Sequence, residues 1–224
     1  GLNNFTILER SNEIGGVWRE NPYPGAACDV PSRLYSFSFE QDYPWSLRYA
    51  PQKEIFEYLK HCIDKYSLTR HIRLGMEVTK ATYDDDAATW SVATKSGEEI
   101  TTGIFISAVG LFNNPSIPDI PGQDTFKGSQ FHSARWDHSV ELDGKTIASI
   151  GSGASAIQYV PELAKISKQL NVFQRTPQHI FAKGDRANAQ QDQSTTLWQK
   201  LSHRRERLQL FTRFEKNSRR RNSE

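Results

Sequence analysis

The first half of the chain contains regular patterns of apolar and polar positions. A helical period runs through residues 51–67, with a proline at the start, and its apolar face consists of Ile55, Phe56, Leu59, Cys62 and Ile63. Apolar runs at 72–78, 90–94 and 100–108 are separated by turn-forming residues at 84–86 and 96–97. The pattern predicts one helix that packs against a core, followed by three strands.

A second pattern begins near residue 144. An apolar run at 146–150 leads into a glycine-containing loop at 151–154, a helical period at 155–166 and a second apolar run at 170–173. This order predicts a strand, a helix and a strand parallel to the first. Residues 5–9 form a further short apolar run that reads as a buried parallel strand and ends at Glu9. The fold class expected is therefore α/β.

The loop after residue 150 has the pattern Gly-x-Gly-x-x-Ala in the context that a dinucleotide site requires. In this pattern the first glycine permits a tight turn, the second lets the backbone approach a pyrophosphate, and a small third residue lets the helix pack closely. The phosphates would then lie at the N-terminus of a helix, where backbone N–H groups favour anions. The loop consists of Gly151, Ser152, Gly153, Ala154, Ser155 and Ala156.

The end of the next strand indicates which nicotinamide nucleotide the loop binds. Sites for NAD offer a carboxylate there, about 20 residues after the loop, to bind the ribose 2′-hydroxyl. Here the sequence is Gln-Arg-Thr-Pro, without a carboxylate. Arg175 can form a charge-assisted fork with a 2′-phosphate and Thr176 can add a hydroxyl bond. NADPH is favoured over NADH, and the alternative is that Arg175 is a solvent-facing charge at a strand end.

A stiff, aromatic segment at residues 13–39 favours a flat cofactor. Gly15 and Gly16 allow close backbone approach, prolines stiffen the Tyr-Pro-Gly-Ala-Ala-Cys-Asp stretch, and Trp18 and Tyr35 supply aromatic rings. In a dinucleotide fold, the position of Glu9 binds a ribose diol, and a glycine loop lies about 20 residues before it. Only eight residues precede Glu9. We therefore expect a fragment that lacks the first strand, its glycine loop and the first helix of this unit.

Composition excludes several classes of protein. With 37% apolar and 24% charged residues, the chain is neither disordered nor fibrous. No leader-like segment or membrane-length apolar run is present, which predicts a soluble, cytoplasmic protein without membrane contact. Cys28 and Cys62 are not at metal-ligand or redox-pair spacing, so we expect reduced thiols and no metal site.

A basic tail contains the main charge asymmetry. Residues 203–224 hold eight Lys and Arg against three Glu, a balance that can indicate nucleic-acid binding. Four apolar residues nevertheless recur there at roughly helical spacing: Leu197, Leu201, Leu208 and Phe211. An amphipathic helix with a solvated face is the favoured interpretation, and no nucleic-acid partner is expected.

Three sequence blocks together resemble the Baeyer–Villiger monooxygenases over residues 1–182. They are G-G-V-W with Y-P-G-A-A-C-D, F-K-G-S-Q-F-H-S-A-R-W-D, and G-S-G-A-S-A-I-Q with Q-R-T-P. The resemblance implies an FAD- and NADPH-dependent monooxygenase that inserts one oxygen atom of O2 beside a ketone carbonyl through a C4a-peroxyflavin. The product would be an ester or a lactone. One departure is Ala108-Val-Gly110, where relatives usually carry Ala-Thr-Gly.

By the resemblance, the flavin nucleotide would contact Glu9, Gly16, Trp18, Asp29, Tyr35 and Val78. Asp29 would be the catalytic carboxylate beside the flavin ring, paired with an arginine from a later segment than this chain contains. The fingerprint block would form the connection between the FAD and NADP domains and act as a hinge, through Phe126, Gly128, His132, Trp136 and Asp137.

Two alternatives stay open. Flavin-dependent oxygenases of sulfur and nitrogen centres usually have Tyr or Phe where Trp136 and Asp137 stand, which favours the ketone oxygenase. A catalytically inactive fragment that binds only nucleotide is the other alternative. A dithiol reductase is disfavoured, because the two cysteines are 34 positions apart.

The expected domains are a partial FAD-binding domain with the fingerprint linker at 1–138, a partial NADP-binding unit at 139–182, and the start of a helical segment at 183–224.

Overall fold

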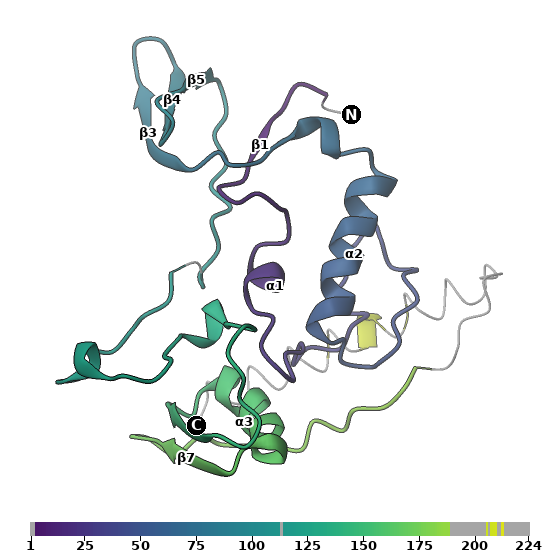
Figure 1. The fold of residues 1–224 in the computed structure, drawn as a ribbon. Helices are drawn as coiled ribbons and strands as arrows, with labels where there is room; N and C mark the ends of the chain where they lie inside the picture. The colour runs from purple at the N-terminus through teal and green to yellow at the C-terminus, as the bar shows by residue number, and fades with distance from the viewer. Residues whose placement is uncertain (1–2, 113, 189–204, 206, 210–211, 213–224) are drawn as a thin grey trace, which may run out of the picture. The chain divides into compact units, whose positions relative to one another are not determined.

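The computed structural model describes residues 3–112, 114–188, 205, 207–209 and 212 (Figure 1). Its strands are β1 (Ile7–Leu8), β2 (Ile72–Arg73), β3 (Val78–Asp84), β4 (Thr89–Thr94), β5 (Glu99–Thr102), β6 (Thr146–Ile150) and β7 (Gln169–Phe173), and its α-helices are α1 (Val17–Glu20), α2 (Gln52–Lys65) and α3 (Ala154–Ile166). Two compact units are formed, one by residues 1–20 and 59–126 and the other by residues 21–58 and 127–224.

The first unit begins with a short parallel pair of strands. Ile7 pairs with Ile72 and Leu8 with Arg73. The backbone N–H of Glu9 donates to the Arg73 carbonyl at 3.0 Å, so the ladder continues to the predicted end of the strand. The expected strand at 5–9 is present but has only two residues in regular pairing.

A three-stranded antiparallel sheet with the order β3-β4-β5 also belongs to this unit (Figure 1). The prediction of one strand over 72–78 is wrong, because Gly75 adopts a positive φ of 70° and bends the chain between β2 and β3. The prediction of a strand over 100–108 is confirmed only to residue 102. Beyond it, Ile104 and Ile106 are 77% and 81% exposed. A strand forms only beside a partner, and no neighbouring strand in the described ranges pairs with this run.

The second unit contains the strand–helix–strand element that the sequence predicts. β6 and β7 are parallel and in register from Thr146 with Gln169 to Ile150 with Phe173. Helix α3 connects them and begins at Ala154, one residue earlier than expected. Ala156 and Leu163 are its buried residues, and the helix packs against β7. The prediction of a parallel βαβ element is confirmed.

Aromatic rings surround a buried tyrosine in the second unit. Tyr58, in the first half of α2, is 2% exposed and its ring lies near those of Phe37, Tyr43 and Trp45. Its hydroxyl accepts a hydrogen bond from the Phe37 N–H at 2.8 Å and donates to the Glu40 carbonyl at 2.9 Å. The predicted helix at 51–67 is confirmed over most of its length, but its most buried aromatic residue was not in the predicted apolar face.

Replacing Tyr58 with Phe tests the importance of this hydroxyl. The change leaves a backbone donor and a backbone acceptor without their partner, so we expect a loss of about 2 kcal/mol in the free energy of unfolding. Urea denaturation of the purified chain measures it. Tyr83→Phe is the matched control, because Tyr83 is 44% exposed and the change should cost less than about 0.5 kcal/mol. Equal losses in the two variants would contradict this account of the Tyr58 hydroxyl.

A late segment of the chain pairs with an early one in the second unit. Leu47 and Ala187 form an antiparallel bridge, and the Arg48 N–H donates to the Arg186 carbonyl at 2.9 Å. The side-chain amide of Asn188 donates to the carbonyls of Trp45 and Leu47. The described residues of 205–212 are helical, as expected, whereas Leu197, Leu201 and Phe211 of the predicted amphipathic face lie outside the described residues.

None of the helices in the described ranges is long and apolar enough to cross a membrane. The same ranges contain no cluster of three His, Cys, Asp or Glu side chains arranged to hold a metal ion.

Candidate functional site

The loop between β6 and α3 has open space above its backbone. Gly151 has a φ of 103°, which favours glycine, and its N–H donates to the Phe173 carbonyl at 2.8 Å, so the turn is fixed to the neighbouring strand. Cβ atoms built on Gly151 and Gly153 would meet no atom within 4 Å. The Ser152 hydroxyl donates to the Thr176 carbonyl at 3.4 Å. A phosphate can therefore approach this backbone directly.

The N-terminus of α3 has no side-chain cap. Gly153 is the N-cap residue in an extended conformation, and the first intrahelical bond runs from the Ile157 N–H to the Gly153 carbonyl at 3.0 Å. The free N–H groups of the first turn and the helix dipole together favour an anion at this end. Ala156 is 7% exposed, so a larger side chain at this position would disturb the packing of the helix.

Arg175 and Thr176 follow directly after β7, at the same end of the parallel strands as the loop. Both residues are exposed, as are Gly151 and Gly153. Parallel strands place their carboxyl ends at one edge, which is where ligands bind in such folds. The arrangement provides a backbone cradle for a pyrophosphate with an exposed guanidinium one strand away.

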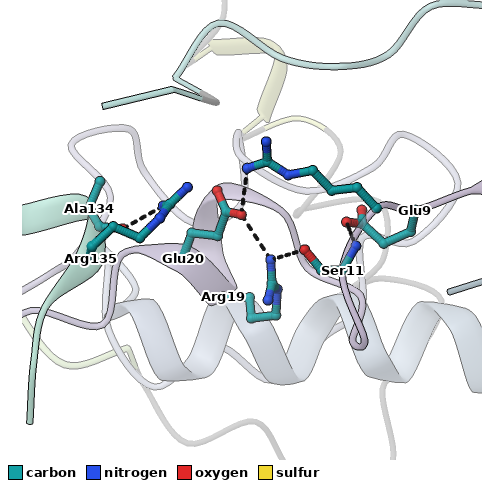
Figure 2. Close-up of polar contacts among 7 residues, drawn as sticks. Glu9, Ser11, Arg19, Glu20, Ala134 and Arg135 are labelled. Carbon is teal, nitrogen blue, oxygen red and sulfur yellow. Dashed lines mark hydrogen bonds and ion pairs between the residues drawn. The ribbon is translucent and has the colours of Figure 1, made fainter. Parts of the chain in front are cut away.

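In the first unit, hydrogen bonds link Glu9 through Ser11 to Arg19 and Glu20 of helix α1 (Figure 2). The Ser11 N–H donates to Glu9 Oε1 at 2.9 Å, and Arg19 Nη2 donates to the Ser11 hydroxyl at 2.7 Å and to Glu20 Oε1 at 2.9 Å. Arg10 pairs with the same Glu20 oxygen at 3.0 Å. The Ser11 N–H thus orients the Glu9 carboxylate just after the end of β1.

The glycine turn in this unit is as open as the loop in the other. Gly16 has a φ of 51°, and a Cβ there would meet no atom within 4 Å. The Trp18 N–H donates to the Gly15 carbonyl at 3.1 Å and starts helix α1. Val78 lies at the first position of β3 and is 37% exposed. Gly16, Trp18 and Val78 thus lie in the same unit as Glu9.

Asp29 and Tyr35 belong to the second unit, and both are exposed. The backbone before Asp29 is fixed: the Cys28 N–H donates to the Ala50 carbonyl at 3.0 Å. Cys28 itself is a buried free thiol, like Cys62. Burial raises the pKa of the Cys28 thiol above its ordinary value of 9.0 and is the dominant cause. The hydrogen bond from the Val30 N–H opposes it, the charge of Asp29 adds to it, and the charge of Lys183 and the Asp29 N–H lower the pKa.

The raised pKa predicts slow alkylation of Cys28. Iodoacetamide reacts with the thiolate, so the rate at Cys28 in the folded chain should rise with pH to a midpoint above 9.0. By linkage, the buried neutral thiol favours the folded state, and this contribution is lost as the pH rises above 9.0 toward the folded pKa. Peptide mass spectrometry separates Cys28 from Cys62. A midpoint at or below that of the urea-unfolded chain would contradict the prediction.

Helix α3 contacts the segment before Asp29 through Gln158 and Tyr159, for which the sequence predicted no role of their own. Gln158 forms two hydrogen bonds with the backbone of Ala27, and Tyr159 makes an edge contact with the ring of Tyr23. The Tyr159 hydroxyl is 2.9 Å from the hydroxyl of Ser149, a buried residue of β6. The sequence does contain an indication of this contact, because Gln158 is a polar residue among the apolar residues Ile157, Tyr159 and Val160.

The fingerprint residues form a local structure in the second unit. Trp136 lies between the rings of Phe131 and Tyr159, with centroid distances of 5.2 and 5.5 Å. His132 Nδ1 accepts a hydrogen bond from the Ala134 N–H at 3.1 Å and caps a short 3-10 turn, and Arg135 donates to the Ala134 carbonyl (Figure 2). The Ser139 hydroxyl and N–H hold the pKa of Asp137 below its ordinary value.

The remaining two fingerprint positions, Phe126 and Gly128, are exposed. Phe126 is the last residue of the first unit, and the second unit resumes at Lys127.

Comparison with known proteins gives the family. The model of the FMO-like family, described as flavin-binding monooxygenase-like, matches residues 1–191. The chain belongs to the flavin-binding monooxygenase-like family. It is 46% identical over 187 residues to a Baeyer–Villiger monooxygenase of Streptomyces coelicolor, covering 84% of this chain and 36% of that protein. It is 42% identical, with the same coverage, to a Baeyer–Villiger monooxygenase of Pseudomonas aeruginosa.

Solved structures agree with the family membership. A cyclohexanone monooxygenase from Rhodococcus sp. Phi1 bound to NADP+ is 40% identical with a TM-score of 0.77, covering 82% of this chain and 35% of that one. An oxidized steroid monooxygenase bound to NADP is 38% identical with a TM-score of 0.80, covering 89% and 39%. The expected α/β class with Rossmann-type units is confirmed. The chain spans about a third of the length of the relatives it matches.

Proposed function

We propose that the chain is part of an FAD- and NADPH-dependent Baeyer–Villiger monooxygenase that converts a ketone to an ester or lactone with O2. The observation that carries the proposal is the open glycine loop with Arg175 at the adjacent strand end, in a chain of this family. The Trp136–Asp137 ending of the fingerprint supports a ketone rather than a sulfur or nitrogen centre as the substrate.

The residues around the loop fit NADPH. The uncapped first turn of α3, with Ser152, Ala154 and Ser155, would hold the pyrophosphate, and the backbone of Gly151 and Gly153 leaves room for it. Arg175 would bind the 2′-phosphate, and Thr176 would add a hydroxyl bond. Relatives with NADP in their solved structures, such as the Rhodococcus enzyme, support this assignment.

A second group of residues fits parts of FAD. The oriented Glu9 carboxylate would bind the adenosine ribose, Gly16 would let the cofactor pass close to the backbone, and Val78 would lie near the adenine. Trp18 and Tyr35 would lie along the flavin. When bound, this cofactor supplies the chemistry that activates O2, and NADPH supplies the hydride. A solved relative in complex with FAD and NADP supports both cofactors.

The chain's own residues would position the reactants and control charge. Asp29, on a segment held by backbone bonds on one side and by the Gln158 side chain on the other, would place a carboxylate beside the flavin ring. Its charge would orient a cationic partner from another part of the enzyme. The fingerprint turn, held by His132 and Trp136, would act as the hinge between an FAD domain at 1–138 and an NADP unit at 139–182. A small ketone and O2 are the proposed substrates, and a cytoplasmic location is part of the proposal.

Binding measurements test whether the 224 residues hold both cofactors. Calorimetric titration of the purified chain with NADP+ should give saturable 1:1 binding, and titration with FAD should quench the flavin fluorescence. NADP+ binding without flavin binding would favour the alternative in which the chain binds only nucleotide. Failure of NADP+ to bind the folded chain would contradict the assignment of the loop.

A further inference from the structure

A single side-chain amide satisfies both backbone groups of Ala27, two residues before Asp29. Gln158 Oε1 accepts a hydrogen bond from the Ala27 N–H at 2.9 Å, and Gln158 Nε2 donates to the Ala27 carbonyl at 3.0 Å. The Tyr23 hydroxyl lies 3.4 Å from the same Oε1. A residue in an extended strand presents its N–H and its carbonyl on the same side, and a primary amide is a matched partner for both.

The opposite edge of this segment pairs with backbone. The Cys28 N–H donates to the Ala50 carbonyl at 3.0 Å, and the Gln52 N–H donates to the Ala26 carbonyl at 2.8 Å. The Gln158 side chain therefore occupies the place that a neighbouring strand would have, and residues 26–28 are held from two sides. One of those two sides is a side chain of α3, so the position of the segment depends on the position of the helix.

The contact between the helix and the segment is close along its length. Gly25 packs on the backbone of α3: a Cβ there would lie 2.6 Å from the Gln158 carbonyl oxygen. One residue further along α3, the Tyr159 ring contacts both Tyr23 and the fingerprint Trp136. At Gly25 the backbones are too close for a side chain to fit between them, so a shift of α3 would press on this turn.

We propose that Gln158 is a positioning residue that couples nucleotide binding at the N-terminus of α3 to the placement of Asp29. The inference rests on the proposed NADP site. Gln158 lies in the second turn of α3, four residues after Ala154, and a helix transmits displacement along its axis as a rigid element. Phosphates that order the first turn therefore order Ala27 through the amide. By linkage, loss of this coupling weakens nucleotide binding by the same factor.

Hydrogen exchange of the chain without nucleotide tests the clamp. Gln158→Leu removes both bonds, so the Ala27 amide should exchange about five- to tenfold faster, the factor that corresponds to one lost hydrogen bond of typical strength. Gln158→Glu keeps the acceptor for the Ala27 N–H but loses the donor to its carbonyl, and should show a smaller increase. Gln169→Leu is the matched control, because Gln169 is exposed and its amide bonds only Asn171 among the described contacts. Circular dichroism identifies any variant that fails to fold.

The coupling is tested with 2′-phospho-ADP-ribose, which carries the pyrophosphate and the 2′-phosphate of NADP but no nicotinamide that could reach Asp29 itself. Saturation with this probe should slow exchange at Ala27, Cys28 and Asp29 at least about threefold in the native chain and in Gln169→Leu. In Gln158→Leu that slowing should disappear, and the dissociation constant of the probe should rise by the same factor as the slowing that is lost.

The outcomes of these experiments decide separately on the Gln158 coupling and on the nucleotide site. Unchanged Ala27 exchange in Gln158→Leu, or probe-induced protection that persists in this variant, would overturn the proposal. Absence of probe binding to the native chain would overturn the nucleotide site and, with it, the coupling, whereas the exchange rates without nucleotide would still report the clamp. The two failures are therefore distinguishable.

Discussion

Replacing Gly25 with Ala should destabilise the chain by about 3 kcal/mol. Gly25 has a φ of 76°, and a left-handed conformation costs an L-residue about 1–2 kcal/mol. The new Cβ would also lie 2.6 Å from the Gln158 carbonyl oxygen and 3.1 Å from Glu162 Cγ. The first neighbour is backbone and cannot rotate away, so overpacking adds about 1–3 kcal/mol. Urea denaturation measures the total.

Gly144→Ala isolates the backbone part of this effect. Gly144 lies in the same unit with a φ of 66°, but a Cβ there would meet no atom within 4 Å. Its replacement should therefore cost only the left-handed penalty, about 1–2 kcal/mol. The difference between the variants measures the contact of the Gly25 turn with α3. If both variants lose the same free energy, the turn does not pack on the helix as described.

Replacing Arg175 with Ala should reduce the affinity for NADP+ by about 10- to 100-fold, because a charged, forked hydrogen bond to the 2′-phosphate is lost. NAD+ lacks this phosphate, so its affinity should change less than about twofold, on the scale of neutral surface changes. Calorimetry on the folded chain gives the dissociation constants for NADP+ and NAD+. Their ratio would not change if Arg175 had only a structural role.

Lys168→Ala is the control for loss of positive charge. Lys168 is exposed and lies immediately before β7, whereas Arg175 lies just after its end. Because parallel strands bind ligands at their carboxyl ends, charge at the opposite end should have little effect on either nucleotide. A comparable fall in NADP+ affinity in both variants would show a general electrostatic effect rather than recognition of the 2′-phosphate.

The sequence predicts local elements well where period and turn chemistry agree. The β6–α3–β7 element follows from apolar runs around a glycine loop, and its observed bounds differ from the expected ones by one residue at the helix start and one at β7. The helix at 52–65 follows from its apolar face. These features depend on neighbours within about 20 residues, which is the range over which sequence patterns carry information.

Contacts between residues far apart in the sequence could not be predicted, because no local pattern of residues specifies them. The run at 104–106 has the apolarity of a buried strand, but Ile104 and Ile106 are exposed, since strand formation depends on a partner elsewhere. The amide of Gln158 meets Ala27 across 131 positions of sequence. Tyr58 is buried because it bonds the backbone at Phe37 and Glu40, which its place on a helical period does not reveal.

The central claim is that this sequence belongs to an enzyme that oxygenates a ketone with NADPH and O2. The most direct measurement is to incubate the protein that carries these 224 residues with FAD, NADPH, a cyclic ketone and an alkyl sulfide under 18O2. The account predicts NADPH consumption that depends on the ketone and a lactone that contains one 18O atom. A labelled sulfoxide with unreacted ketone, or a lactone that carries no label, would contradict it.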